Sequence, residues 1–151
     1  MLTAPTIESL TFTLTEEVHV RASLETTFAS ILVQMGRQNA GPDGQPLPML
    51  LEAWPGGRWY RDLGNGDGHL WGHVQGIKRP TLLEIYGPLF MSYPAMSNVQ
   101  YRLKEVEDGT LMVFRHTALG LLQDEHKTGM VQGWRPLLAR IRRDAEASEP
   151  R

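Results

Sequence analysis

A chain of 151 residues, 41% of them hydrophobic, is long enough to bury one substantial core, and we expect a single domain over residues 1–151. The absence of cysteine excludes disulfides, thiolate catalysis and cysteine-ligated zinc, and the formal net charge of −2 with dispersed Lys and Arg does not match a nucleic-acid-binding surface. The N-terminus lacks a signal-peptide pattern, and no apolar run reaches the roughly 20 residues of a membrane span, so we expect a cytoplasmic protein.

The first regular element is predicted at residues 12–22, FTLTEEVHVRA, which alternate and are rich in β-branched side chains, as strands are. Ser23 is a favoured N-cap residue, and apolar side chains then recur at spacings of three and four as far as Met35. Because glycine commonly follows the last turn of a helix, Gly36 marks its end. The connection that follows, GRQNAGPDGQPLP, is expected to be irregular, with at most a short turn of helix.

The middle of the chain reads as a series of short strands separated by turn signals. The segments are LLEAW or part of it, GRWYRDL, GHLWGHVQGI, TLLEIYG, NVQYRLKEVE and TLMVFRHTAL, and the turn signals are PGG, GNGDG, KRP and EDG. Short strands joined by tight turns predict an antiparallel meander and not βαβ units.

Residues 61–73, RDLGNGDGHLWGH, resemble three kinds of site and match none of them well. A phosphate-binding loop should lead into a helix, but a strand follows here, and a calcium loop should end in a glutamate that is missing. His69 and His73 would lie about 13 Å apart on a strand at roughly 3.3 Å per residue, too far to share one metal ion. We therefore predict a hairpin turn over residues 64–68 and no metal site.

The last element is predicted to be a long helix from about residue 124 to residue 147. Its apolar stripe consists of Met130, Trp134, Leu137, Leu138, Ile141 and Ala145. Pro136 lies inside it, where proline costs about 3 kcal/mol and usually kinks the helix. Gly129 and Gly133 lie just upstream, so either the helix bends there or the small residues make room for something beside the sheet.

Large aromatic residues are concentrated in the strand region between residues 54 and 114. Any one of these residues can simply belong to the core. A single helix rarely fills a concave sheet of six or seven strands, so we expect a cavity that the set as a whole helps to line. The residues expected to bind a ligand there are Trp59, Trp71, Tyr86, Phe90, Met91, Tyr101, Phe114, His116, Met130 and Trp134.

Two titratable residues are candidates for acid–base chemistry, and the sequence leaves the role of each open. His116 ends the row of Met112 and Phe114, where it can be either a pocket base or a buried, fully hydrogen-bonded histidine. Glu84 shares a face with Tyr86, so its carboxyl group is buried, with a raised pKa, only if that face of the strand points inward. The catalytic residues, if the protein is an enzyme, stay unknown at this stage.

The loop at residues 87–96, GPLFMSYPAM, is unusually apolar. An apolar loop can be a lid over a cavity, part of a homodimer interface, or a cap on the core. The sequence favours none of these three roles over the others.

The order of elements and five motifs resemble the START-like superfamily, which includes polyketide cyclases and lipid-transfer proteins, and within it the branch of the C-terminal domain of the heat-shock-protein-90 ATPase activator. The motifs are VRASLETTFASIL, PGGRWYRD, GHVQGIKRPTLLEIYG, GTLMVFRHTALG with His116, and GWRPLLARI with Gly133 and Trp134. Together they span about residues 10–146. The resemblance implies an α+β helix-grip fold: a curved antiparallel sheet wrapped around a long C-terminal helix, with one or two short helices after the first strand.

Three functions are compatible with this resemblance. The first is binding of a small hydrophobic or aromatic molecule in the cavity, without a cofactor or metal. The second is an enzyme that uses His116, Glu84 or Tyr101 as acid or base, for example in cyclisation, dehydration or hydrolysis. The third is an interaction module, either a co-chaperone or a homodimer formed through the loop at residues 87–96.

Overall fold

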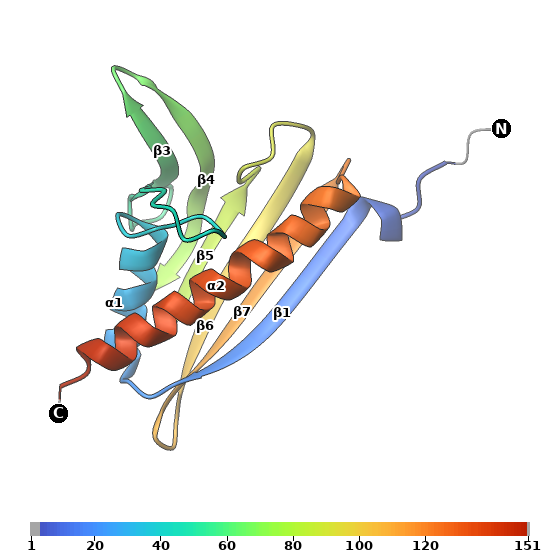
Figure 1. Ribbon diagram of the computed structural model, residues 1–151. Coiled ribbons are helices and arrows are strands. Elements are labelled where there is room, and N and C mark those ends of the chain that lie inside the picture. The colour runs from blue at the N-terminus through green and yellow to red at the C-terminus, as the bar shows by residue number, and fades with distance from the viewer. Residues whose placement is uncertain (1–3, 151) are drawn as a thin grey trace.

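The computed structural model describes residues 4–150 and shows a curved antiparallel sheet crossed by one long helix (Figure 1). The sheet has seven strands in the order β1-β7-β6-β5-β4-β3-β2. Its strands are β1 Thr11–Val20, β2 Leu50–Leu51, β3 Arg58–Gly64, β4 Asp67–Lys78, β5 Leu82–Gly87, β6 Ala95–Val106 and β7 Gly109–Gly120. The helices are the 3₁₀ turn η1 Glu8–Leu10, α1 Leu24–Met35 and α2 Asp124–Ser148. This is the expected α+β helix-grip fold.

Helix α1 begins and ends where the sequence predicts. The Ser23 side-chain oxygen accepts a hydrogen bond from the Thr26 N–H at 3.1 Å, which satisfies one of the free donors of the first turn. Gly36 follows the last turn, and its N–H donates to the Val33 carbonyl at 3.2 Å. One helix, and not two, follows the first strand, because the connection at residues 36–49 is held by turns and by a single Ala40–Pro46 bridge.

The glycine-rich stretch at residues 64–68 closes the β3–β4 hairpin, as predicted. Gly64, Asn65 and Gly66 all have positive φ, at 90°, 56° and 83°, the region that glycine and asparagine tolerate best. His69 accepts the Trp71 indole N–H instead of facing a metal. Within residues 4–150, no group of three or more His, Cys, Asp or Glu side chains could hold a metal ion.

The concave face of the sheet and one side of α2 form the core. Met112, Phe114 and His116 on β7 are fully buried, as are Val99 and Tyr101 on β6, so the period-two rows point inward as expected. The six residues of the α2 stripe from Met130 to Ala145 are buried against them. The inward face of β5 is that of Leu83 and Ile85, which places the Glu84 side chain on the convex side of the sheet, where Gln100 donates to it.

Helix α2 continues through Pro136 from Asp124 to Ser148. Proline has no N–H group, so the carbonyl four residues earlier, that of Gln132, receives no hydrogen bond from position 136. Gln132 is exposed. Water can therefore satisfy the group that Pro136 leaves free. No helix in the described part of the chain has the length and apolar character needed to cross a membrane.

Candidate ligand-binding cavity

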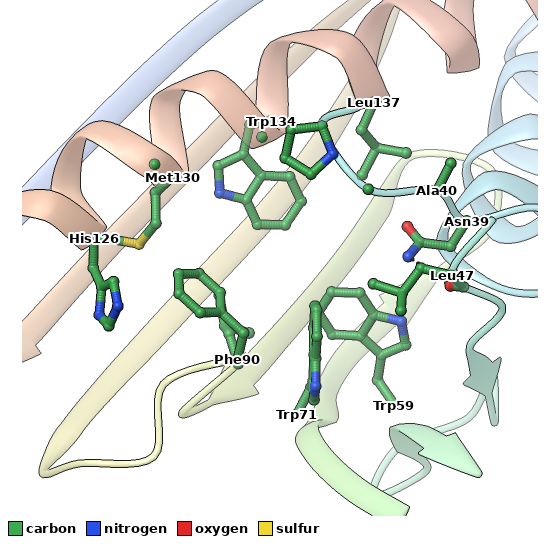
Figure 2. A pocket seen from close by; sticks show the side chains of 15 residues that line it. Asn39, Ala40, Leu47, Trp59, Trp71, Phe90, His126, Met130, Trp134 and Leu137 are labelled. Atoms are coloured by element: carbon green, nitrogen blue, oxygen red, sulfur yellow. Dashed lines mark hydrogen bonds between the residues drawn. The ribbon is translucent and has the colours of Figure 1, made fainter. Parts of the chain in front are cut away.

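A cavity of about 330 Å³ lies between one end of α2 and the β3–β4 side of the sheet (Figure 2). Side chains from four parts of the fold form its wall: the α1–β2 connection, strands β3 and β4, the β5–β6 loop and helix α2. Pro42 and Phe90 are its two exposed lining residues, so the cavity meets solvent between the α1–β2 connection and the β5–β6 loop.

Three tryptophan side chains belong to the wall, and each points its N–H group at a protein acceptor. The indole nitrogen of Trp59 donates to the Met35 carbonyl at 2.8 Å, that of Trp71 to His69 Nδ1 at 3.0 Å, and that of Trp134 to His116 Nδ1 at 2.9 Å. Because these donors are already satisfied, the rings present carbon to the cavity.

His116 does not line the cavity; it lies behind Trp134 and holds it. The indole N–H can only donate, so His116 Nδ1 must be the acceptor and Nε2 carries the proton, which it donates to the Ser97 Oγ at 2.9 Å. Burial lowers the pKa of the His116 imidazole from its ordinary 6.5 to about 4. His116 is therefore neutral at physiological pH and serves as a buried positioning group for a wall residue.

The structure divides the ten residues expected at the site into two sets. Trp59, Trp71, Phe90, Met130 and Trp134 line the cavity. The other five residues, Tyr86, Met91, Tyr101, Phe114 and His116, are not part of its wall.

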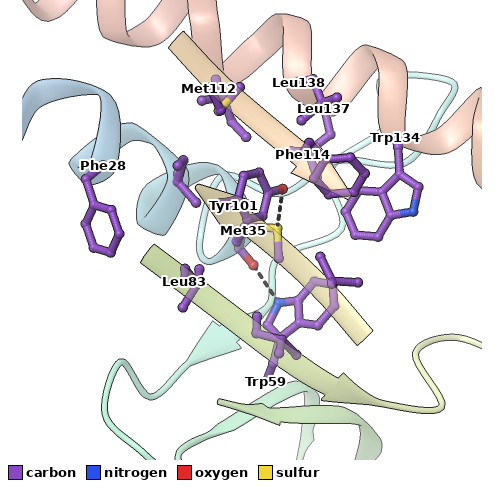
Figure 3. Packing of buried hydrophobic residues seen from close by; sticks show 14 of the residues in the cluster. Phe28, Met35, Trp59, Leu83, Tyr101, Met112, Phe114, Trp134, Leu137 and Leu138 are labelled. Atoms are coloured by element: carbon purple, nitrogen blue, oxygen red, sulfur yellow. Dashed lines mark hydrogen bonds between the residues drawn. The ribbon is translucent and has the colours of Figure 1, made fainter. Parts of the chain in front are cut away.

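Tyr101 and Phe114 belong to the core beneath the cavity (Figure 3). The Tyr101 hydroxyl donates to the Met35 sulfur at 3.2 Å, and burial raises the pKa of this phenol well above its ordinary value. The Phe114 ring packs between Tyr101 and Trp134, with ring centroids 5.1 and 4.7 Å apart. Both residues support the wall without reaching a ligand.

Tyr86 lies on the convex side of the sheet, where it is 41% exposed and stacks on His73. It alternates with Ile85 and Gly87, which are buried. The same alternation that brings Ile85 into the core therefore turns Tyr86 away from the cavity.

The apolar β5–β6 loop caps the core and supplies one edge of the cavity. Leu89 and Met91 are buried in the core, whereas Phe90 between them is 37% exposed at the cavity mouth. Leu89 adopts a positive φ of 58°, an uncommon conformation for leucine, and its N–H donates to the Trp71 carbonyl at 2.8 Å. This bond fixes the loop to β4 and sets the direction of Phe90.

Helix α2 contributes a cavity residue that the sequence analysis missed. His126 lies one turn before Met130, and its Nδ1 is 2.6 Å from the Tyr93 hydroxyl, with the two rings stacked at 5.3 Å. Its spacing of i, i+4 and i+8 to Met130 and Trp134 was a signal that could have identified it. Gly129 and Gly133 also border the cavity, which explains the small residues before Pro136.

The α1–β2 connection forms the opposite wall and carried no recognisable signal in the sequence. Asn39, Pro42 and Leu47 reach the cavity from this segment, which has no helix or strand period. Two anchors hold it: the Asn39 Nδ2 donates to the Leu47 carbonyl at 2.9 Å, and an Arg140 guanidinium nitrogen donates to the Ala40 carbonyl at 3.0 Å.

The chemistry of the wall is therefore mostly that of hydrocarbon, with an amide at one end and an imidazole at the other. Glu84, His116 and Tyr101, the acid–base candidates from the sequence, do not contribute to it. The two polar side chains of this otherwise apolar wall are those of Asn39 and His126.

Comparison with known proteins agrees with the fold and the sequence motifs. Residues 45–145 match the family described as activator of Hsp90 ATPase homolog 1-like protein. No curated protein matches the chain in sequence. A solved structure from Rhizobium leguminosarum is similar with a TM-score of 0.71 and 21% identity, covering 91% of this chain and 96% of that one.

Two further solved structures share the fold at lower identity. A protein of Chromobacterium violaceum has a TM-score of 0.70 at 14% identity, covering 89% of this chain and 96% of that one. The di-domain ARO/CYC StfQ from the steffimycin biosynthetic pathway has a TM-score of 0.64 at 10% identity, covering 93% of this chain and 51% of its own. From the match over residues 45–145, the chain belongs to the family of activator of Hsp90 ATPase homolog 1-like proteins.

Proposed function

We propose that the protein binds a small, largely apolar, ring-containing molecule in the cavity between α2 and the β3–β4 side of the sheet. The observation that supports this most is the set of three indole rings on the wall, each with its N–H bonded elsewhere in the protein. Filling such a surface with an apolar ring leaves no buried donor without a partner. The cavity volume of about 330 Å³ lies at the lower end of the range for small-molecule sites.

The comparisons support the same class of function. The ARO/CYC neighbour belongs to a biosynthetic pathway, which is consistent with a small organic molecule as the ligand of this fold. The family description names activation of the Hsp90 ATPase, which corresponds to the interaction-module alternative. Formation of a homodimer through the β5–β6 loop stays a prediction from the sequence. Analytical ultracentrifugation tests it by measuring the mass of the protein in solution.

Gly129→Leu is expected to block the cavity while making the protein more stable. A Cβ at Gly129 meets no atom within 4 Å, so a side chain can start there without a clash, and we expect leucine to occupy space at the edge of the cavity. Leucine also has a higher helix propensity, so unfolding is expected to require up to about 1 kcal/mol more. Titration with N-phenyl-1-naphthylamine, a neutral fluorescent probe, should show at least tenfold weaker binding to the variant, and thermal unfolding should show a raised Tm.

Gln132→Leu is the matched control for this experiment. Gln132 is exposed on the same helix and is not part of the cavity wall, so leucine there adds apolar surface without filling the site. Its affinity for the probe should equal that of the wild type. Equal binding to all three proteins would place the probe outside the cavity and contradict the proposal, and no binding to any of them would favour the interaction module.

A second candidate function is acid–base chemistry on the bound molecule. The one observation that favours it is the position of the His126 imidazole in the cavity wall. Its Nδ1 is bonded to Tyr93, while its Nε2 has no hydrogen-bond partner in residues 4–150 and the ring lines the cavity. Such an imidazole can remove a proton next to a ketone and return one from solvent. With 1-tetralone in D₂O, NMR should show deuterium entering at C2 faster with the wild type than with His126→Gln. Identical rates would remove this candidate.

A further inference from the structure

The most informative polar group of the cavity is the side-chain amide of Asn39. Asn39 is only 6% exposed, and it lines the cavity. Its Nδ2 donates to the Leu47 carbonyl at 2.9 Å, but its Oδ1 accepts no hydrogen bond from any residue between 4 and 150. This oxygen is not among the fully buried unpartnered atoms of the described residues, so it is accessible and can accept a hydrogen bond from a molecule in the cavity.

The orientation of this amide is fixed by its surroundings. Turning the group over would place Oδ1 against the Leu47 carbonyl, two acceptors with no proton between them. The backbone around it is held as well, since the Asn39 N–H donates to the Gly36 carbonyl at 3.0 Å and the Asn39 carbonyl accepts from the Leu47 N–H at 2.9 Å. Arg140 anchors the next residue, Ala40. Nδ2 is therefore held at the Leu47 carbonyl, and Oδ1 is the atom of the amide that has no partner within residues 4–150.

The Asn39 side-chain oxygen points toward the tryptophan rings of the cavity wall. In Figure 2 the Asn39 amide oxygen faces the space bordered by Trp59 and Trp134. A ring held against these indole faces would bring its edge, and not its face, toward Asn39. A substituent on that edge then meets Oδ1.

We infer that the ligand is a ring compound with a hydrogen-bond donor, a hydroxyl or N–H, on the edge that meets Asn39 Oδ1. This inference rests on the proposed function and adds the polarity of the ligand to it. A ligand with only an ether or carboxylate oxygen at that position would place two acceptors together and bind less tightly. Asn39 is thus a specificity-determining residue that selects phenols and aryl amines over their alkylated forms.

Two probes that differ only in whether the ring oxygen carries a hydrogen or a methyl group test this inference. 2-Naphthol has the donor, and 2-methoxynaphthalene has the same ring and oxygen without it. Tryptophan fluorescence of the full-length wild type should report binding of both, with the naphthol about threefold to tenfold tighter, as expected for one net hydrogen bond. The methyl ether is the more apolar molecule, so equal or tighter binding of the ether would overturn the inference while leaving the proposed function in place.

Asn39→Leu provides the second arm of the test. The substitution removes Oδ1 and also the bond to the Leu47 carbonyl, so a purely structural effect would weaken both probes by the same factor. The inference requires the naphthol preference itself to disappear or reverse. Gln38→Leu, on an exposed neighbour outside the cavity wall, should keep the wild-type preference. Failure of the wild type to bind either probe would contradict the proposed function and this inference together.

Discussion

Lowering the pH from 6.5 to 4 is expected to reduce the free energy of unfolding by about 3 kcal/mol through His116 alone. Burial lowers the pKa of this histidine to about 4, whereas in the unfolded chain it titrates near 6.5. Between these two values the unfolded state binds a proton that the native state does not, so stability falls as the pH falls and levels off below about pH 4. Protonation would also place two N–H groups together at Nδ1 and the Trp134 indole.

Urea unfolding at pH 7, 5.5 and 4 measures this contribution when the wild type is compared with His116→Gln. The variant has no imidazole to protonate, so it should lose about 3 kcal/mol less than the wild type on acidification. It should be less stable at pH 7, because it loses the packing of the buried ring and its bonds to Ser97 and Trp134. His19→Gln is the matched control, because His19 is exposed on β1, and its profile should follow that of the wild type. Parallel profiles for wild type and His116→Gln would mean that His116 has the same pKa in the native and the unfolded state, which would contradict the prediction.

The sheet and both helices could be predicted because their signals are local. Period-two rows such as Met112, Phe114 and His116 require only that alternate side chains face one core, and the structure buries all three. Ser23 and Gly36 specify the ends of α1 by satisfying backbone groups next to them in sequence. Strand β2 is only part of the segment LLEAW. It pairs only through Leu50 and Leu51, at the edge of the sheet.

The cavity was predictable only in part, because its wall depends on contacts between distant segments. Aromatic content identified Trp59, Trp71 and Trp134, but not which acceptor each indole N–H would find. Asn39 lies in a connection without any period, and its position comes from bonds to Leu47 and from Arg140 far along the chain. Tyr86 shows what strand alternation cannot predict. Alternation shows that β5 has two faces, but it does not identify the face that lies on the concave side of the sheet.

Trp59 links the cavity to the core, and its replacement by alanine is expected to lower the free energy of unfolding by about 4 kcal/mol. The indole is 1% exposed, and its N–H donates to the Met35 carbonyl in the last turn of α1, where carbonyls lack partners within the helix. Met35 in turn accepts the Tyr101 hydroxyl at its sulfur, so one residue of α1 is bonded to both β3 and β6 (Figure 3). Alanine removes the ring and leaves a void that continues the cavity.

Trp59→Phe separates the hydrogen bond from the packing of the ring. Phenylalanine keeps most of the buried apolar surface but leaves the Met35 carbonyl without its donor, so we expect a loss of about 1–2 kcal/mol. Trp54→Ala is the matched control, because Trp54 is 58% exposed and its loss should change stability by no more than about 0.5 kcal/mol. Chemical denaturation of the three variants tests this order. If Trp59→Phe proved as stable as the wild type, the indole N–H would contribute nothing to holding α1 against the sheet. Trp59 would then stabilise the fold only through the packing of its ring.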